Sequence, residues 1–556
     1  MTTPDQTAVI VIGGSLVGLS TALFLSSWNV PVILLESHPS SSVHPRALGY
    51  TTRTIECYRS VGIESRLPVT HWTGGPPRRV SVQSLAGKWQ DEQHWTPKPN
   101  EPPGPPPAGA GGRPSNLYEG ISPVAAIAVS QDKIEPVLRE TAREKGADLR
   151  LGHKVTNWSQ DNDGVTVTAA DSNGVECTIQ GKYLIACDGA HSPVREALGI
   201  TRSGVGHLKV LRSILFFCPR LDKYLKFGIA QFQIEGREDG FEGFMMTYGG
   251  GRWALMWNPP DKVAATREEM DEATQKDMIR KAAGENLPEE DIELITTGEW
   301  QLSGLVADTF SSGRVFIAGD AAHTLPPNRG GYGANTGIAD AHNLAWKLAS
   351  VLNGTSRPDL LRTYDAERRP AAKVRHDQMF VRDDYTRHIK GLEWAGRGTI
   401  ILDDVAMELG QMYRSEGVVG GDEDVPAAKR PDEWNGQPGT RAPHVSLRRD
   451  GEAISSLDLF CHGWVLVSKD IAWEKPASLA SEATGVDVAF VHVGEDADVQ
   501  ETDGGIVGES FGIGETGAIL VRPDGYVAWR SSSNGDKEMK ALGSVLGQVS
   551  FATKGN

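Results

Sequence analysis

Three acidic residues follow strand-like apolar runs in this sequence. Glu36 ends the run "PVILLES", Asp188 follows "YLIAC" and Asp320 follows "VFIAG". Acidic side chains at the carboxyl ends of parallel strands lie where open α/β sheets bind their ligands. One such aspartate alone is commonly a helix N-cap. Three in one chain indicate a shared ligand site.

A glycine-rich turn precedes the first of these acids. The segment "AVIVIGGSLVGLS" fits the G-x-G-x-x-G fingerprint, except that Ser15 stands in the position of the second glycine. The start of the following helix would hold a pyrophosphate, Glu36 would accept hydrogen bonds from a ribose, and the Ser15 hydroxyl can donate to a phosphate oxygen. We therefore predict a dinucleotide site; a turn serving only helix–strand packing is the alternative. The predicted phosphate-binding residues are Gly13, Gly14, Ser15, Leu16, Val17 and Gly18.

The hydrophobic pattern predicts the elements that position this turn. A run of apolar residues at 8–13 indicates a strand buried on both faces, and leucines at helical spacing indicate a helix at 15–27. A second buried strand is expected at 31–37. By contrast, "GIGETG" at 512–517 fits the fingerprint letter for letter, but no helix follows, so we exclude it as a nucleotide site.

A second glycine-rich segment follows Asp320. The stretch "AAHTLPPNRGGYGANTG" leads into alanines and leucines at helical spacing, so a helix is expected to begin near Asn335 to Gly337. The positive end of that helix dipole would stabilise negative charge on a cofactor lying against the loop.

Composition limits the class of protein. A chain of 556 residues suggests about two to four domains. Its formal net charge of −16 disfavours nucleic acid as a partner, and no apolar run approaches the ~20 residues of a membrane span. Five cysteines without a CxxC pair indicate reduced thiols. We expect a cytoplasmic protein with no membrane partner.

Together these motifs resemble the class A flavin-dependent aromatic monooxygenases, the para-hydroxybenzoate and phenol hydroxylase group. The landmarks of that group look like "GGSLVG" at 13–18, "DGAHSPVR" at 188–195, "GDAAH" at 319–323 and "LLRTYDAERRP" at 360–370. The segments "GGSLVGLSTALFL" and "NTGIADAHNLAWKL" look most similar to those of hydroxylases that act on aromatic polyketides.

The resemblance implies that one FAD is bound, with Glu36 at the adenosine ribose, Arg46 near the pyrophosphate and Asp320 at the ribityl chain. NADPH or NADH would visit transiently, and O2 would be the second substrate. The loop before Asn335 looks one residue longer than usual, which leaves open whether Gly330, Gly331 or Tyr332 faces the flavin. The implied FAD-contacting set beyond the turn is Glu36, Ser37, Arg46, Gln131, Val155, Asp188, Gly189, Gly319, Asp320, Gly330, Gly331, Gly333, Ala334 and Asn335.

The implied reaction is hydroxylation of a phenolic or polycyclic aromatic compound through a flavin 4a-hydroperoxide. Such a site must exclude water. Pro326 and Pro327 would form a rigid wall near the ring, and His323 and Arg46 complete the candidate catalytic set. Two alternatives stay open: Baeyer–Villiger or epoxide-forming oxygenation of a polycyclic ketone, and a flavoprotein that binds an aromatic metabolite without oxygenating it.

The expected fold is α/β: a Rossmann-like FAD-binding domain, an inserted β-sheet substrate domain and a C-terminal thioredoxin-like domain without CxxC, which suggests a structural or dimer-forming role and a possible homodimer. The apolar residues expected to line the substrate pocket are Phe227, Phe232, Met246, Trp253 and Met256. The expected boundaries are 1–80, 115–200 and 300–375 for the FAD domain, 81–114 and 201–299 for the substrate domain, 376–430 for a helical connector and 431–556 for the last domain.

Overall fold

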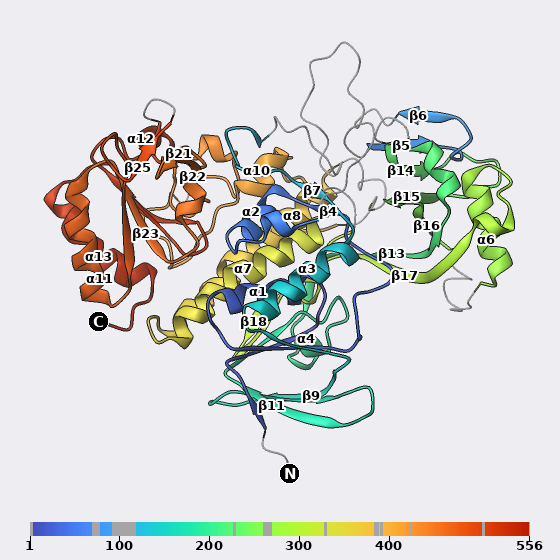
Figure 1. Ribbon diagram of the computed structural model, residues 1–556, viewed down its shortest axis with the longest axis horizontal. Helices are drawn as coiled ribbons and strands as arrows, with labels where there is room; N and C mark the ends of the chain where they lie inside the picture. The colour runs from blue at the N-terminus through green and yellow to red at the C-terminus, as the bar shows by residue number, and fades with distance from the viewer. Residues whose placement is uncertain are drawn as a thin grey trace.

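The computed structural model describes residues 4–68, 78–91, 118–225, 229–259, 270–326, 331–382, 389, 393–422, 424–502 and 506–554. Three parts are visible in Figure 1: a central α/β part, a large sheet that extends to one side, and a C-terminal part on the other side. Phe227, Pro327, Gly330 and the proline-rich stretch at 97–114 lie outside the described residues.

The central sheet has the order β18-β19-β12-β2-β3-β8. Its strands from β19 to β8 pair in parallel, and the short apolar β2, β12 and β19 are fully buried, as expected for a sheet covered on both faces. The expected strands at 8–13 and 31–37 are confirmed. The strands are β2 (Val9–Ile12), β3 (Val32–Glu36), β8 (Asp148–Leu151), β12 (Tyr183–Ala186), β18 (Ser311–Ser312) and β19 (Val315–Ile317).

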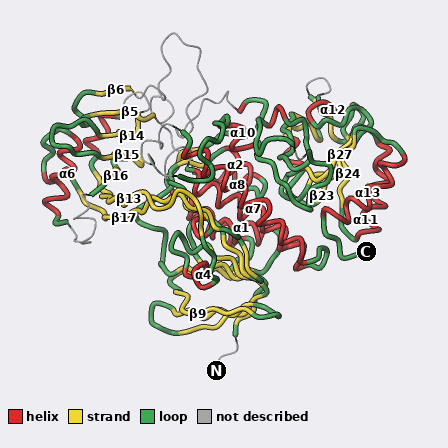
Figure 2. The backbone as a smooth tube through the Cα atoms, turned by 180° about the vertical axis from the view of Figure 1, so that it is seen from behind, coloured by secondary structure: helices red, strands yellow, loops and turns green. Residues whose placement is uncertain are grey.

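Helices pack beside this sheet, as Figure 2 shows from behind. The expected helix at 15–27 is α1 (Leu16–Ser27), which contacts α3 (Gln131–Glu144) and α7 (Tyr332–Leu352). The structure corrects the expected start of α7, which begins at Tyr332 because Gly331 adopts a φ of +63° and caps the helix. Two shorter helices, α2 (Thr52–Arg59) and α4 (Pro193–Ala197), and the long α8 (Arg362–Phe380) also belong to this part.

Two small sheets border the central part. One has the order β1-β11-β10-β9 and the other pairs β4 with β7. Their strands are β1 (Asp5–Gln6), β4 (Gly49–Tyr50), β7 (Ile127–Ala128), β9 (Lys154–Gln160), β10 (Val165–Ala170) and β11 (Glu176–Gly181).

The large sheet has eight strands in the order β20-β17-β13-β16-β15-β14-β5-β6. The long antiparallel pair β13 and β17 carries the chain out of the central part and back (Figure 1). Helix α6 (Glu272–Ala283) packs on one face, and its Ile279 and Ala282 join the apolar core there. The strands are β5 (Arg78–Val82), β6 (Trp89–Asp91), β13 (Arg202–Phe217), β14 (Ile229–Ile234), β15 (Gly243–Gly249), β16 (Arg252–Trp257), β17 (Glu293–Ala307) and β20 (His323–Thr324).

The C-terminal part contains a sheet of order β24-β23-β26-β27, with β23 and β24 parallel and the other pairs antiparallel. A β-α-β unit followed by β-β-α is the thioredoxin-like arrangement, which agrees with the expected fold class. The "GIGETG" segment lies between α12 (Val507–Ser510) and β26, with no helix directly after it. The main elements are β23 (Trp464–Ser468), α11 (Glu474–Thr484), β24 (Val488–His492), β26 (Ala518–Val521), β27 (Val527–Ser531) and α13 (Asp536–Val549), flanked by β21 (Ser446–Arg449), β22 (Glu452–Ser455) and β25 (Val499–Glu501).

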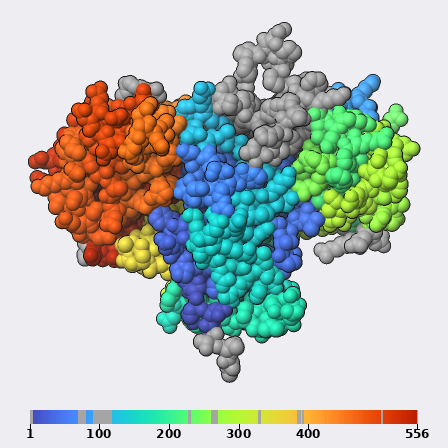
Figure 3. Space-filling view, viewed as in Figure 1, coloured from blue at the N-terminus to red at the C-terminus, as the bar shows by residue number. Residues whose placement is uncertain are grey.

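The described residues of the predicted connector at 376–430 include two helical segments. Helix α8 (Arg362–Phe380) ends just inside it, and α10 (Asp404–Leu409) is the one further α-helix in its described portion. The C-terminal part lies directly against the central part (Figure 3). No helix among the described residues is long and apolar enough to cross a membrane.

His342 of α7 gives the fold a specific acid sensitivity. It packs edge-on against Phe24, and burial lowers its pKa to about 3. Because the folded state resists protonation, the contribution of His342 to stability is complete above the unfolded pKa of about 6.5 and falls as the pH drops toward 3. Between pH 7.5 and pH 5.0, we expect the free energy of unfolding of a His342→Gln variant to fall by about 2 kcal/mol less than that of the wild type. Urea unfolding at the two pH values measures this difference; equal losses would contradict it.

Candidate functional site

The turn between β2 and α1 needs its glycines for steric reasons. Gly13 adopts a φ of +102°, and a Cβ there would lie 2.3 Å from the Cys187 carbonyl oxygen. A Cβ on Gly18 would lie 1.8 Å from the Gly13 carbonyl oxygen. Ser15 differs, because it has a φ of −85° and is exposed, so its backbone does not require glycine. The missing glycine of the fingerprint therefore leaves the turn intact.

The Ser15 hydroxyl ties this turn to α3. It donates to Glu135 Oε1 at 3.1 Å and accepts from Gln131 Nε2 at 2.8 Å. Gln131 in turn accepts from the backbone N–H groups of Arg46 and Ala47, each at 3.2 Å. The network joins three segments around the turn. Sequence reasoning missed Glu135, although its i+4 spacing from Gln131 was a visible signal.

We expect a Ser15→Gly variant, which restores the full fingerprint, to retain FAD with less than about tenfold weaker affinity. The variant loses two hydrogen bonds worth about 1 kcal/mol each, partly replaced by water at this exposed position. Flavin released on dilution, followed by fluorescence, measures the effect. Complete loss of flavin would show that the hydroxyl itself carries the phosphate site.

Glu36 ends β3 as an ionised hydrogen-bond acceptor. Burial alone would raise its pKa, but N–H donors of His38 at 2.8 Å and Gly14 at 2.6 Å lower the pKa below its usual value. Ser37 Oγ also donates to this carboxylate, at 3.1 Å. The position and charge fit an acceptor for the hydroxyls of a ribose.

The carboxylates of Asp188 and Asp320 lie at the ends of β12 and β19. Asp188 Oδ1 is buried without a hydrogen-bond partner, and burial raises its pKa. Burial also raises the pKa of Asp320, against the opposing charges of His323 and Arg46. Next to these acids, Gly189 and Gly319 adopt φ values of +86° and +62°. The unpartnered Oδ1 of Asp188 fits the hydroxyl-rich chain of a bound dinucleotide.

Close packing brings the loop before α7 and the start of that helix to the edge of the central sheet where β12 and β19 end. A Cβ on Gly319 would lie 2.9 Å from Val17 Cγ2, and one on Gly333 would lie 3.9 Å from Asp320 Oδ1. The first turns of α1 and α7 therefore approach each other around Asp320. Ala334 packs at the margin of the central core.

Asn335 fixes the start of α7 to the segment that contains β4. Its Oδ1 accepts from the Thr51 N–H at 3.0 Å and from Thr54 Oγ1 at 2.6 Å. Its Nδ2 donates to the carbonyl oxygens of Gly49 and Gly331, at 3.1 and 2.9 Å. These four hydrogen bonds fix the N-terminus of α7 beside the preceding loop. The positive end of the helix dipole there would stabilise negative charge on a cofactor ring.

The catalytic prediction for His323 is corrected by its surroundings. The ring lies in β20 with no exposed surface, and Nε2 is 2.7 Å from Asp340 Oδ2. Asp340 is held on its other oxygen by Arg368 Nε at 2.8 Å. A fully buried histidine held by a carboxylate at Nε2 fits a structural role, and its Nδ1 is buried without a hydrogen-bond partner. Pro326 is buried, and Val155 lies in β9 of the small four-stranded sheet.

The candidate pocket residues divide between the two faces of the large sheet. Met246 and Met256 cluster with Tyr248 on the face toward the central part, and Tyr248 Oη donates to the Pro45 carbonyl at 2.8 Å. Phe232 and Trp253 lie in the core between the sheet and α6, with no exposed surface. The prediction that these two line the pocket is therefore wrong, because alternate residues of a strand point to opposite faces.

His44 is a candidate functional residue that sequence reasoning missed. It is 8% exposed, its ring lies edge-on to Trp300 at 5.5 Å between centroids, and neither ring nitrogen has a hydrogen-bond partner. Burial lowers its pKa, so the imidazole is neutral at pH 7. The signal was its position two residues before Arg46 in "HPRALGY".

Two families of known proteins match successive parts of this chain. Residues 6–378 match a family described as "FAD binding domain", and residues 435–549 match "Aromatic-ring hydroxylase, C-terminal". A 4-methyl-5-nitrocatechol 5-monooxygenase of Burkholderia sp is 36% identical over 99% of this chain and 98% of that protein. The tetracenomycin A2 monooxygenase-dioxygenase of Streptomyces glaucescens is 34% identical over 99% and 98%.

Solved structures give the same result across the whole chain. Aklavinone-11 hydroxylase in complex with FAD and aklavinone matches with a TM-score of 0.84 and 30% identity, covering 99% of this chain and all of that one. The flavin-dependent monooxygenase PieE, in complex with FAD and substrate, has a TM-score of 0.80 and 26% identity over 98% and 99%. The expected fold class, family and FAD cofactor are confirmed. This chain therefore belongs to the FAD-dependent aromatic-ring hydroxylases and is a flavin monooxygenase that uses O2 and NAD(P)H.

Proposed function

We propose that this enzyme hydroxylates a phenolic, polycyclic aromatic compound of the polyketide type. The observation that carries the proposal is the apolar, methionine-lined sheet face toward the central part, on a chain similar along its full length to an aklavinone hydroxylase. Bound FAD, reduced by NAD(P)H, supplies the oxygen chemistry. The apolar face excludes water and offers a flat surface against which an aromatic ring can pack.

We propose the following binding roles for the FAD-contacting residues. Glu36 accepts from the adenosine ribose, and the turn from Gly13 to Gly18 binds the pyrophosphate at the start of α1. Asp320 accepts from the ribityl hydroxyls. The start of α7, from Gly331 to Asn335, lies against the isoalloxazine edge. Secondary contacts are proposed for Ser37, Arg46, Gln131, Val155, Asp188, Gly189, Gly319, Gly333 and Ala334.

We propose His44 as the proton acceptor for the substrate phenol. It is a neutral imidazole that packs edge-on against Trp300, a neighbour of the Met246 and Met256 cluster, with no ring hydrogen bond to break. A His44→Gln variant keeps a polar side chain but cannot take up a proton. We expect kcat at pH 7 to fall roughly 100-fold. The loss should shrink at higher pH, where the phenol ionises in water; a pH profile of kcat unchanged by the variant would contradict this role.

The substrate class is tested with a panel of phenols offered to the purified holoenzyme. A tetracyclic phenol such as aklavinone and the small 4-methyl-5-nitrocatechol represent the two relatives' substrates. We expect NAD(P)H consumption coupled to a product one oxygen heavier, with the higher kcat/KM for the tetracycle. Turnover of the nitrocatechol alone would overturn the polycyclic assignment, and a ring-expanded ester would indicate Baeyer–Villiger chemistry.

Three further expectations accompany this proposal. The described cysteines are all free thiols, which fits action in the cytoplasm beside the NAD(P)H pool. The domain boundaries stay as predicted from sequence. The possible homodimer, formed through the C-terminal part, also stays a prediction.

A further inference from the structure

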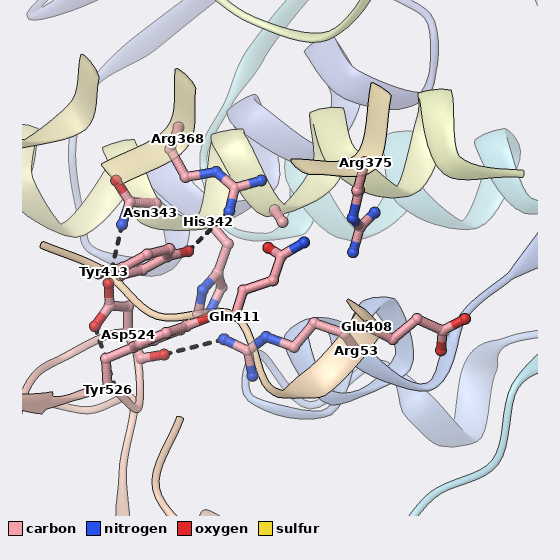
Figure 4. Close-up of a pocket in the computed structure, with 11 residues that line it drawn as sticks. Arg53, His342, Asn343, Arg368, Arg375, Glu408, Gln411, Tyr413, Asp524 and Tyr526 are labelled. Atoms are coloured by element: carbon pink, nitrogen blue, oxygen red, sulfur yellow. Dashed lines mark hydrogen bonds between the residues drawn. The ribbon is translucent and has the colours of Figure 1, made fainter. Parts of the chain in front are cut away.

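A small cavity lies between the FAD-binding part and the C-terminal part. Its walls come from α2, α7 and α8, from the end of α10 and the segment after it, and from the turn between β26 and β27 (Figure 4). We call it the arginine cavity. The cavity volume is about 10 Å³, which is room for roughly one water or one monatomic ion of similar size. Its charged lining residues are Arg53, Arg368, Arg375, Glu408 and Asp524, and its amide lining residues are Asn343 and Gln411.

Arg375 enters this cavity as a buried charge without a carboxylate partner. It is 2% exposed, and Nη1 donates to Thr336 Oγ1 at 3.0 Å. No carboxylate oxygen of the described residues lies within 4 Å of its guanidinium, and its Nε is buried without an acceptor. The neighbouring Arg368 and Arg53, by contrast, pair with Asp340 and Glu56. An unpaired buried guanidinium is costly unless a ligand compensates its charge.

Gln411 offers a second donor without an acceptor. Its side chain is 4% exposed, its Nε2 is buried without a partner in the described part of the chain, and its amide reaches up between Arg368 and Arg375 (Figure 4). Two donors from different segments therefore face one small space. An acceptor is required there.

The charge balance around the cavity favours an anion over water. Glu56 pairs with Arg53 and also with Arg441, so this triad has one excess positive charge. The neighbouring network of Lys347, Arg522, Glu367 and Asp524 is balanced, as is Arg368 with Asp340. Glu408 offsets the formal charge of Arg375 from more than 4 Å away but forms no ion pair with it. One monovalent anion neutralises the whole group.

We propose that the arginine cavity binds one chloride ion, held by Arg375 Nε and Gln411 Nε2. The volume is close to that of a single water, so it excludes phosphate or a carboxylic acid and limits the ligand to one atom of about that size. Because Arg375 also holds Thr336 in the second turn of α7, the ion fastens the segment after α10 to the helix that borders the flavin. Chloride binding therefore stabilises the junction between the two parts of the chain.

Thermal unfolding of the holoenzyme tests the proposal in sodium chloride and in sodium gluconate at equal ionic strength. We expect a Tm roughly 2–4 °C higher in chloride for the wild type. A Gln411→Glu variant, which places a carboxylate at the ion position, should lose this dependence. The same substitution at the exposed Gln500 is the control and should keep it. Identical wild-type Tm values in both salts would overturn the proposal.

Crystals of the wild-type holoenzyme grown or soaked in bromide give an independent test that needs no variant. We expect an anomalous difference peak between Arg375 and Gln411, absent in an Arg375→Gln variant if that protein crystallises. A peak of ordinary water density, with no anomalous signal, would show that the cavity holds water. Neither outcome depends on the identity of the aromatic substrate.

Discussion

A Gly18→Ala variant is expected to lose FAD almost completely. The added Cβ would lie 1.8 Å from the Gly13 carbonyl oxygen, which belongs to the same turn and cannot move without displacing the start of α1. A backbone clash of this kind costs more than about 3 kcal/mol, or over about 100-fold in affinity. The ratio of flavin to protein absorbance after purification, and titration of the apoprotein with FAD, measure the loss.

Gly543→Ala is the matched control for this substitution. Gly543 lies in α13 with ordinary backbone geometry, and a Cβ there would only touch Ala480 at 3.8 Å. That variant should retain full FAD content and gain slightly in helix stability. The account of the turn would be contradicted by a Gly18→Ala protein that purifies with a stoichiometric amount of flavin.

The second large effect is expected at the junction between the FAD-binding and C-terminal parts. Arg522 donates to Glu367 at 2.6 and 2.9 Å and to Asp524 at 2.6 Å, and all three side chains are buried. An Arg522→Met variant leaves an uncompensated buried carboxylate, which costs about 3–5 kcal/mol. We expect a markedly lower Tm and faster proteolytic release of the C-terminal part.

Removing a second charge separates electrostatics from packing at this junction. In Arg522→Met/Asp524→Asn the remaining Lys347 and Glu367 form a balanced pair at 2.7 Å. This double variant should be more stable than the single one. If both unfold at the same temperature, the loss arises from packing of the long side chain and not from the unpaired charge.

The strand–turn–helix–strand unit could be predicted because its signals are local. Buried strands, glycines and Glu36 occur within one short stretch, and each constrains its neighbours through backbone geometry. The role of Ser15 could not be predicted, because its partners Gln131 and Glu135 come from a helix more than a hundred residues later. The start of α7 was missed for a related reason: an αL glycine at position 331 starts the helix earlier than the apolar pattern indicates.

The substrate side was less predictable because it depends on which face of a sheet is covered. Composition marked Phe232, Trp253, Met246 and Met256 alike as bulky apolar residues. Only the packing of α6 assigns the first two to the core and leaves the methionines on the face toward the central part. His323 similarly sits in a motif beside Asp320, yet its partner Asp340 comes from the following helix.

The central claim, monooxygenation of an aromatic ring on FAD, is tested most directly by turnover under ¹⁸O₂. Purified holoenzyme, NAD(P)H and a tetracyclic phenol are mixed, and the product is analysed by mass spectrometry. The account predicts one ¹⁸O atom in the product ring for each NAD(P)H consumed. NAD(P)H consumption that yields only hydrogen peroxide, or a product whose new oxygen comes from water, would contradict it.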